Sequence, residues 1–464
     1  ADFSNLVIIH TNDTHGFDRR AEGINGMATV SALRKHYLSQ GKDVLLVDAG
    51  DAIQDNNLVN FSKGKSAIAF MNAAGYDAMA LGNHEFDYRS GGLADMLKTA
   101  KNSGETVPKL VVCNVDWDAM SAAYRKFLPH IDNNYDFAEL LSEWLGELNV
   151  SHTGGRYYAS GQSEPTASLG LLFDWNYRDK GMRIAEVIEK GPFDNASTKA
   201  KAGIIIEKID GTEITPEMDY YTLLNDKAKK KTLVSLYNPQ TKERWEEVVI
   251  PISGSALNTL LYTRWVKQRA ADVDKWSNGR LGYVHIQSMG DPSFRSVYSD
   301  ILGKYNDREG IVIDTRFNGG GRLHEDIEIL FSGEKYLTQV TRGREACDMP
   351  SRRWNKPSIM LQCEANYSNA HGTPWVYKHQ QIGRLVGMPV PGTMTTVSWE
   401  TLQDPTLVFG TPITGYRLSD GSYLENTQLE PDVKVANSPE TVVKGEDTQL
   451  RTAVQELLKE IDKK

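Results

Sequence analysis

Three short segments within residues 1–116 each place polar side chains directly after an apolar run. The side chains are Asp13 and His15 in the first segment, Asp51 in the second, and Asn83, His84 and Asp87 in the third. Short apolar runs that end in turn residues predict strands, and helical patterns lie between them. Because the carboxyl ends of parallel strands meet at one edge of a sheet, we expect these side chains to lie close together.

These residue types suit a divalent metal site. Carboxylate, imidazole and amide groups bind hard or borderline ions such as zinc or manganese. We predict a pair of ions held by Asp13, His15, Asp51 and Asn83, with Asp51 as the bridge. Such a pair activates a water molecule and clamps a phosphoryl group. His84, oriented by Asp87, would protonate the leaving oxygen. One such turn alone would be an ordinary strand end, but three in order favour a site.

A second set of residues is suited to nucleophilic catalysis. Ser368 follows the apolar run SIMLQ and precedes a helical pattern, and a strand–turn–helix position exposes a serine hydroxyl. The run IVIDTRF ends in NGGG, where Gly320 or Gly321 can bring a backbone N–H close to an oxyanion, together with the amide of Asn369. His152, in SHTGG, is the candidate base. Ser151 and Glu425 are the residues available to orient it. Taken singly, Ser368 is one of many serines and NGGG is an ordinary tight turn.

The order of the segments around these residues is similar to that in a known protein family. ELNVSHTGGRY, GRLGYVHIQSM, IVIDTRFNGGG, YSNAHG, LVGMPVPGT and YLENTQLEPDV follow one another as they do in the tricorn-type branch of the C-terminal-processing serine peptidases. The resemblance implies a cofactor-free serine endopeptidase that acts on peptides or unfolded proteins. By position it makes Ser368 the nucleophile and His152 the general base. Ser151 and Glu425 become the relay, with Glu430 as a rival acid, and Gly320 or Gly321 and the Asn369 amide become the oxyanion hole. An acidic residue follows the nucleophile in tricorn protease, so the role of the Asn369 side chain stays open.

The beginning of the chain resembles a different family. IIHTNDTHG, GDAIQ, ALGNHEFD and VVCNVD are similar to the 5′-nucleotidase type of calcineurin-like metallophosphoesterases. The resemblance ends near Asp116, because that family adds a later histidine and an H-x-H pair. None of the 10 histidines in this sequence forms H-x-H. We therefore expect a partial phosphoesterase domain with an incomplete site, and a chimeric chain is one hypothesis for the junction.

These patterns predict a multidomain α/β and α+β protein. We expect a partial metallophosphoesterase sheet over 1–116, a helical segment with the catalytic histidine over 117–163, a PDZ-like module over 164–252 and a serine peptidase core over 253–464. A PDZ module adds a peptide C-terminus as a strand, and we place its carboxylate loop near Leu169–Leu172. A purely structural spacer is the alternative. His324 and His371 are interpreted as packing or polar support, and Cys363 as a buried apolar residue.

Composition narrows the function classes. The sequence has 464 residues, of which 40% are hydrophobic and 24% charged, with a net charge of −9 and Cys 3. These values exclude collagen-like and disordered proteins and argue against non-specific nucleic-acid binding. No apolar run is long enough for a membrane span. Since Ala1 is the first residue, we expect the mature end of an exported, periplasmic or extracellular protein. The rival functions are a metal-dependent phosphoesterase and an inactive PDZ scaffold. The sequence leaves open whether the protein forms a homo-oligomer.

Overall fold

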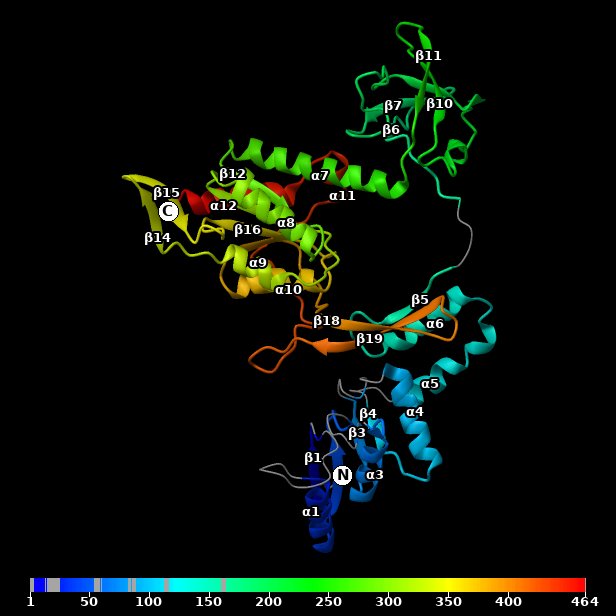
Figure 1. Cartoon of the computed structure of the whole chain (residues 1–464), viewed down its shortest axis with the longest axis vertical. Helices are drawn as coiled ribbons and strands as arrows, with labels where there is room; N and C mark the ends of the chain where they lie inside the picture. The colour runs from blue at the N-terminus through cyan, green and yellow to red at the C-terminus, as the bar shows by residue number, and fades with distance from the viewer. Residues whose placement is uncertain are drawn as a thin grey trace. The chain divides into compact units, whose positions relative to one another are not determined.

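The chain forms two compact units, described here separately. The computed structural model describes residues 4–12, 14, 26–53, 59, 61–81, 85, 89–111, 117–159 and 164–463. Unit 1 comprises Ala1–Ala159 and Gly392–Thr427, and unit 2 comprises Ser160–Pro391 and Gln428–Lys464 (Figure 1). The segment 392–427, which the sequence placed within the peptidase core, therefore packs with residues far upstream of it.

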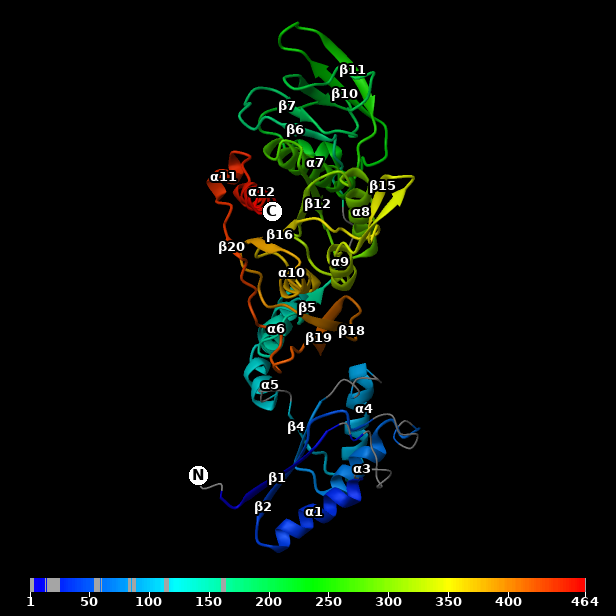
Figure 2. The same cartoon turned by 90° about the vertical axis from the view of Figure 1, so that its left-hand side faces the viewer.

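Unit 1 begins with a parallel sheet in the order β1-β2-β3-β4 (Figure 2). Its strands are β1 (Leu6–Thr11), β2 (Asp43–Asp48), β3 (Ala78–Ala80) and β4 (Lys109–Val111), joined by helices α1 (Met27–Ser39), α3 (Lys65–Ala74) and α4 (Arg89–Asn102). Each strand lies where the apolar runs predicted one. Leu46 is fully buried, whereas the paired residues Ile8 and Leu45 are 61% and 38% exposed. Because side chains alternate along a strand, one face of β1 and β2 is packed and the other is exposed.

The rest of unit 1 is a helical segment packed on a small antiparallel sheet. The elements are α5 (Trp117–Arg125), the 3₁₀ turn η2 (Leu128–His130), α6 (Asn134–Gly146), β5 (Gly154–Tyr157), β18 (Thr395–Thr401) and β19 (Leu407–Gly415). The strand order is β18-β19-β5. At Gly155 a Cβ atom would come within 2.6 Å of the Ala138 carbonyl, so glycine is what lets α6 lie against β5. The helical segment predicted from residue 117 contains α5, η2 and α6.

Unit 2 begins with an antiparallel module in the order β11-β10-β8-β7-β6. Its elements are β6 (Leu171–Phe173), β7 (Met182–Val187), β8 (Ile205–Ile209), β9 (Thr212–Glu213), η3 (Tyr220–Leu224), β10 (Thr232–Tyr237) and β11 (Arg244–Val249). Residues Tyr220–Leu224 form a single short 3₁₀ turn. Among the described residues, β6 pairs with β7 alone and forms one edge of the sheet.

A second parallel sheet, in the order β12-β13-β16-β17-β20, forms the core of unit 2. The strands are β12 (Leu281–His285), β13 (Gly310–Asp314), β16 (Ser358–Gln362), β17 (Arg384–Gly387) and β20 (Val433–Lys434). The helices are α7 (Gly254–Trp276), α8 (Asp291–Ser299), α9 (His324–Phe331), α10 (Asn369–His379), α11 (Pro439–Val443) and α12 (Thr448–Ile461), with the π-helix η4 (Asp300–Lys304).

Both faces of this second sheet are packed. Ile311 and Ile313 belong to one core cluster, and Val312 between them belongs to another. All three are fully buried. Figure 1 shows α7 and α12 near one another, and their apolar residues share the second cluster with Val312. This is the expected pattern for a parallel sheet covered on both sides.

A hairpin, β14 (Leu337–Thr341) and β15 (Arg344–Met349), was not predicted from the sequence; it is mostly exposed and lacks an apolar alternation. Among the described residues, no helix has the length and apolarity that crossing a bilayer requires.

Candidate active site

Ser368 occupies a strained turn between β16 and α10. It is half-buried, precedes the first helical residue, and has φ 58° and ψ −128°. A residue with a side chain rarely adopts such a backbone, which costs about 1–3 kcal/mol. A sharp, strained strand-to-helix turn is what exposes the nucleophile in serine hydrolases. The predicted strand–turn–helix setting of Ser368 is therefore present.

The buried side chain of Asn366 holds this turn in place. Its Nδ2 donates to Thr315 Oγ1 at 2.9 Å and to the Ala370 carbonyl at 3.1 Å, and its Oδ1 accepts from the Cys363 N–H at 3.2 Å. One side chain thus joins the ends of β13 and β16 to the start of α10. Such a fully satisfied buried network offsets local strain. Burial also raises the pKa of the Cys363 thiol, as expected for an apolar residue rather than a nucleophile.

The glycine loop after β13 lies against the serine. Gly320 has φ 101°, and a Cβ atom there would be 2.6 Å from the Ser368 Cβ. The Gly320 N–H donates to Asn318 Oδ1 at 2.8 Å. Gly321 has φ 137° and packs against the Met289 carbonyl. Only glycine fits these two positions, and Asn318, which the sequence analysis did not single out, fixes the first of them.

The Asn369 side chain connects two helices. Its Oδ1 accepts from the N–H groups of Leu323 and His324 at 2.8 and 3.1 Å, and its Nδ2 lies 2.7 Å from His324 Nδ1. It therefore satisfies donors at the start of α9, which otherwise lack partners within the helix. Asn369 is the first residue of α10, a position whose backbone N–H has no acceptor within the helix. The contacts of its side chain are structural ones.

A buried charge cluster underlies the glycine loop. Arg316 is 1% exposed and binds Asp314 at 2.7 Å and Asp447 at 2.9 Å. Burial raises the pKa of each carboxyl group, but the charge and hydrogen bonds of Arg316 outweigh it, so both pKa values lie below normal. The cluster ties the end of β13 to the start of α12.

His285 adds a second support for the same segment. Its Nε2 lies 3.0 Å from the Arg316 carbonyl, and its Nδ1 lies 2.8 Å from the Tyr262 hydroxyl. Burial lowers the pKa of His285, so the ring is neutral and donates from Nε2 to the carbonyl while Nδ1 accepts. No local sequence signal marks these contacts.

His152 is the centre of a second cluster, in unit 1. The hydroxyls of Ser151 and Thr395 lie 2.8 and 3.1 Å from His152 Nδ1. Glu425 Oε1 accepts from the Ser151 N–H at 2.5 Å. Burial lowers the pKa of His152, and the charge of Glu425 partly opposes this effect. The structure thus brings together Ser151, His152 and Glu425, as predicted, and adds Thr395, which is distant in sequence.

Two other candidates, Glu430 and His371, have contacts of a different kind. Glu430 pairs with Lys434 at 3.3 Å, whereas Glu425 touches Ser151 directly. Glu425 is therefore the better candidate for the relay. His371 is 1% exposed, and burial lowers its pKa to about 4. Its Nδ1 has no hydrogen-bond partner among the residues that the structure describes, so its imidazole is a neutral packing group.

The predicted metal site is only partly within the described structure. Asp51 has φ 58°, and its N–H donates to Glu85 Oε2 at 2.9 Å. The other predicted residues, Asp13, His15, Asn83, His84 and Asp87, lie outside the described residues. Within the described part of the chain, no group of three or more His, Cys, Asp or Glu side chains is arranged to hold a metal ion. Asp51 alone does not make a site, so we derive no chemistry from a metal here.

The loop predicted to bind a peptide carboxylate precedes β6. Gly170 has φ 67°, and its N–H donates to Ser168 Oγ at 3.0 Å. Leu169 and Leu171 are buried in the core of the module. The backbone here turns through a glycine directly before the edge strand.

Comparison with known proteins assigns the peptidase part. Residues 280–435 match the family model "Peptidase family S41", and residues 111–146 match "Tricorn protease C1 domain". Over residues 280–435 the chain is therefore similar to the S41 peptidases, and over 111–146 to the C1 domain of tricorn protease. It is 26% identical over 364 residues to "Putative Tricorn-like protease C-terminal subunit" of Sulfurisphaera tokodaii, covering 75% of this chain and 41% of that protein. It is 25% identical to "Tricorn protease homolog" of Saccharolobus solfataricus, covering 75% of this chain and 33% of that protein.

The similarity to tricorn protease extends to the fold beyond the S41 domain. "Crystal structure of the tricorn protease" superposes with a TM-score of 0.66 at 18% identity, over 87% of this chain and 37% of that chain. The chain spans less than half the length of these relatives, so an activity like theirs is proposed for it rather than assigned to it. The beginning of the chain is 40% identical over 102 residues to "Snake venom 5'-nucleotidase" of Gloydius brevicauda, covering 20% of this chain and 17% of that protein.

Proposed function

We propose that this protein is a serine endopeptidase that hydrolyses peptides or unfolded proteins through Ser368, His152, Ser151 and Glu425. The observation that carries the proposal is the backbone of Ser368, with φ 58° and ψ −128° at the start of α10. Strained backbone conformations cluster at active sites, and a sharp strand-to-helix turn is where serine hydrolases hold their nucleophile. The S41 match over 280–435 supports the same class of reaction.

In the proposed reaction, Ser368 Oγ attacks the peptide carbonyl carbon while His152 Nε2 takes its proton. The C–N bond then breaks, His152 gives the proton to the leaving amine, and water hydrolyses the acyl-enzyme. Nδ1 of His152 is held by the hydroxyls of Ser151 and Thr395. The negative charge of Glu425 favours the imidazolium form that develops during the attack.

For the oxyanion hole we propose the N–H groups of Gly321 and Asn369. The sequence left Gly320 and Gly321 as alternatives. Because the Gly320 N–H already donates to Asn318 Oδ1, Gly321 is the better donor of the two. Two such donors aimed at a developing oxyanion account for several kcal/mol of transition-state stabilisation, roughly 3 kcal/mol each.

The test is active-site labelling with a fluorophosphonate, which reacts only with an activated serine. We expect labelling of the parent protein and of Ser332→Ala, a half-buried serine at the end of α9. The variant Ser368→Ala should not label and should lose peptidase activity by roughly 10⁴-fold or more. Labelling of folded Ser368→Ala at the parent level would contradict the proposal.

A metal-dependent phosphoesterase is the second candidate function, favoured by the 40% identity of the beginning of the chain to a 5′-nucleotidase. The sequence lacks the H-x-H pair of that family, so we expect at most weak hydrolysis. Nucleotide hydrolysis that requires zinc or manganese and disappears in His84→Ala would support it. Location in the periplasm or outside the cell stays a proposal, and fractionation with an antibody tests it.

A further inference from the structure

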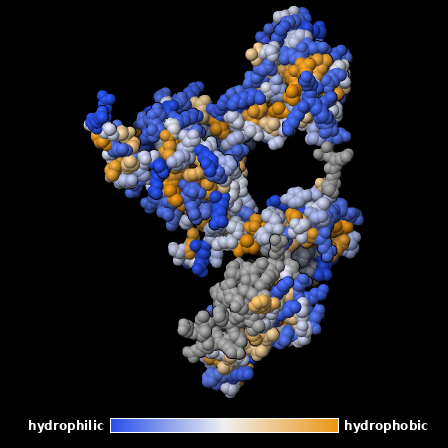
Figure 3. All heavy atoms as spheres, in the orientation of Figure 1, coloured by the Kyte–Doolittle hydropathy of each residue, from blue (hydrophilic) through white to orange (hydrophobic). Residues whose placement is uncertain are grey.

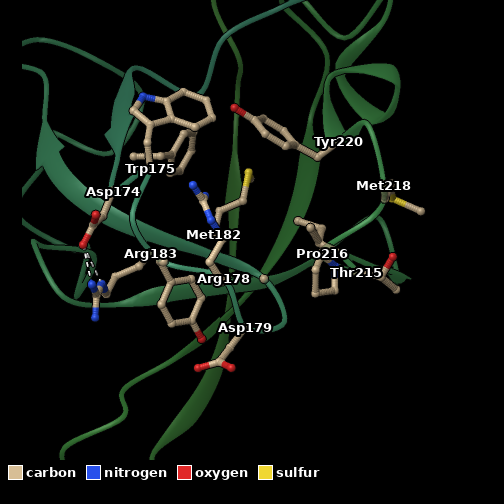
Figure 4. Close-up of a pocket in the computed structure, with 14 residues that line it drawn as sticks. Asp174, Trp175, Arg178, Asp179, Met182, Arg183, Thr215, Pro216, Met218 and Tyr220 are labelled. Atoms are coloured by element: carbon tan, nitrogen blue, oxygen red, sulfur yellow. Dashed lines mark hydrogen bonds and ion pairs between the residues drawn. The ribbon is translucent and has the colours of Figure 1, made fainter.

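Two pockets of unit 2 differ in how their charged side chains are paired. The antiparallel module, part of whose surface is hydrophobic in Figure 3, has a pocket of about 200 Å³ (Figure 4). Its charges compensate one another, because Arg183 pairs with Asp174 and the charge of Arg178 acts on the same carboxylate. A second pocket, of about 180 Å³, lies beside the parallel sheet, where it is lined by α7, β12, α8 and η4.

The second pocket has mainly apolar walls. They are formed by the aliphatic side chains of Val266, Ala270 and Val297 and by the rings of Tyr262, Tyr283 and Tyr305. A Cβ atom at Gly282 would come within 2.6 Å of the Tyr305 ring, so glycine lets this ring lie against β12. The pocket therefore offers a ligand an apolar and aromatic environment.

The π-helix η4 brings two charged side chains, Asp300 and Lys304, to the same pocket. The Tyr305 N–H donates to the Asp300 carbonyl at 2.8 Å, which closes the wide turn of a π-helix, an element found often at functional sites. Burial raises the pKa of the Asp300 carboxyl, and the charge of Lys304 partly opposes this effect. Within the described part of the chain, neither side chain forms a hydrogen bond or a direct ion pair, and the Lys304 ammonium lies 4.5 Å from the centre of the Tyr305 ring.

The charges of the lining indicate what kind of ligand fits. Lys267 also lines the pocket, but the two carboxylate oxygens of Glu189 lie 2.6 and 2.7 Å from its Nζ and neutralise it. The groups left for a ligand are the carboxylate of Asp300 and the ammonium of Lys304. A ligand that satisfies both must carry a cation, an anion and an apolar part. It must also be small, because drug-sized ligands occupy about 300–1,000 Å³.

We propose that this pocket binds a free amino acid with an apolar side chain, such as leucine. Asp300 accepts from the α-ammonium group, and Lys304 donates to the α-carboxylate. Both are charge-assisted hydrogen bonds, which are stronger than neutral ones. The ligand side chain packs against Val266 and Val297. The inference goes beyond the proposed peptidase reaction, because neither charged residue belongs to the Ser368 cluster or to the His152 cluster.

The experiment measures the binding of L-leucine to the full chain by isothermal titration calorimetry. Two analogues test the two charges separately. Leucinamide keeps the ammonium group and lacks the carboxylate, whereas 4-methylpentanoate keeps the carboxylate and lacks the ammonium group. We expect each analogue to bind about tenfold more weakly than leucine, because each loses one charge-assisted hydrogen bond. L-Serine, which keeps both charges, should also bind more weakly because it has no apolar side chain.

Two variants assign each charge to its residue. Asp300→Asn should bind leucine about tenfold more weakly but 4-methylpentanoate no more weakly than the parent protein does, since that analogue has no ammonium group. Lys304→Met should likewise lose affinity for leucine and retain it for leucinamide. Asp307→Asn and Lys275→Met, at exposed residues outside the pocket, are the matched controls and should preserve leucine binding.

Equal affinity for leucine and both analogues overturns the proposal, as does the absence of leucine binding to the folded parent protein. So does an unchanged affinity for leucine in the folded Asp300→Asn and Lys304→Met variants. The analogue series uses the parent protein, so it decides the question even if a variant fails to fold. Because the readout does not depend on Ser368, leucine binding together with failed fluorophosphonate labelling would reject the proposed peptidase while retaining the amino-acid site.

Discussion

Ser368 owes its position to the backbone, whereas His152 owes its position to neighbouring side chains. The serine is the first residue before α10 and follows β16, a strand whose five residues are all buried. His152 lies in a turn before the short strand β5, and two hydroxyl groups hold its ring at Nδ1. The first cluster is therefore part of a packed core, and the second is a set of polar contacts at the surface of unit 1.

This difference has an energetic meaning. Moving Ser368 requires disturbing a parallel sheet packed on both faces, so changes near it should appear mainly as lost stability. The His152 cluster is half-buried and depends on single hydrogen bonds. Changes there should appear mainly as altered rate and pH dependence, with little loss of stability.

The largest expected effect comes from removing the buried charge of Arg316, which lies next to the glycine loop and Ser368. Arg316→Met leaves Asp314 buried without its ion-pair partner and leaves Asp447 with only the more distant Arg269, 4.0 Å away, which should cost about 3–5 kcal/mol. Urea unfolding of the core of unit 2, followed by hydrogen exchange in β13, measures this loss. Arg344→Met, on the exposed hairpin, is the control and should change stability by less than about 0.5 kcal/mol. A loss of similar size in both variants would show that the buried cluster is not what fixes the glycine loop.

Glu425→Gln should alter the histidine cluster without unfolding it, because the amide oxygen can still accept from the Ser151 N–H. Glu425 raises the pKa of His152, so its removal should shift the acid limb of the pH–rate profile to lower pH. The lost stabilisation of the imidazolium should reduce kcat/KM by about 10–100-fold. Glu430→Gln should leave both quantities unchanged, since Glu430 pairs with Lys434. Equal effects of the two variants would refute the assignment of Glu425.

His371 should make the serine cluster acid-sensitive. Burial lowers the pKa of His371 from 6.5 to about 4, so the unfolded chain binds the proton more tightly than the folded one. Stability should fall as pH decreases through 6.5 and continue to fall until about pH 4. By pH 5 the loss is about 2 kcal/mol. Denaturant titrations at pH 7 and pH 5 measure it, and His371→Leu should lack this part of the loss. If the free energy of unfolding of His371→Leu and His371→Asn depends on pH as in the parent protein, His371 is not a buried neutral group.

The smallest expected effect concerns Thr395. Thr395→Val keeps the shape of the side chain and removes one of the two hydroxyls at His152 Nδ1. Because Ser151 remains, we expect kcat to fall by only about three- to fivefold, with KM unchanged and full activity in Thr395→Ser. Steady-state kinetics distinguish this from a structural role, which would lower the melting temperature of both variants. If kcat is unchanged in Thr395→Val, Thr395 does not contribute, and the histidine cluster consists of Ser151, His152 and Glu425.

Local patterns predicted the secondary structure of both clusters well. The apolar runs at 311–313 and 359–361 are buried strands, and the runs near residues 8, 45 and 79 form the first sheet. Ser151 and Glu425 were predicted together with His152, and the structure joins them. The side chain of Asp447 caps the last helix, α12, by accepting from the Leu450 N–H.

Other contacts were beyond prediction because no local signal encodes them. Thr395 lies 243 residues from His152, and Asp447 lies 131 residues from Arg316. Nothing in the sequence near Asn369 indicates that its side chain caps α9 rather than facing substrate. The choice between Gly320 and Gly321 also required the Asn318 contact.

The sequence by itself determined the strands, the helices and the residue types that peptidase chemistry needs, because periodicity and turn residues act over a few neighbouring positions. Only the tertiary structure decided that 392–427 packs with α6 and β5, and that Arg316 is buried between two carboxylates. Those features depend on which distant segments exclude water together. Which segments do so is decided by the packing of the whole chain, and no short stretch of the sequence encodes it.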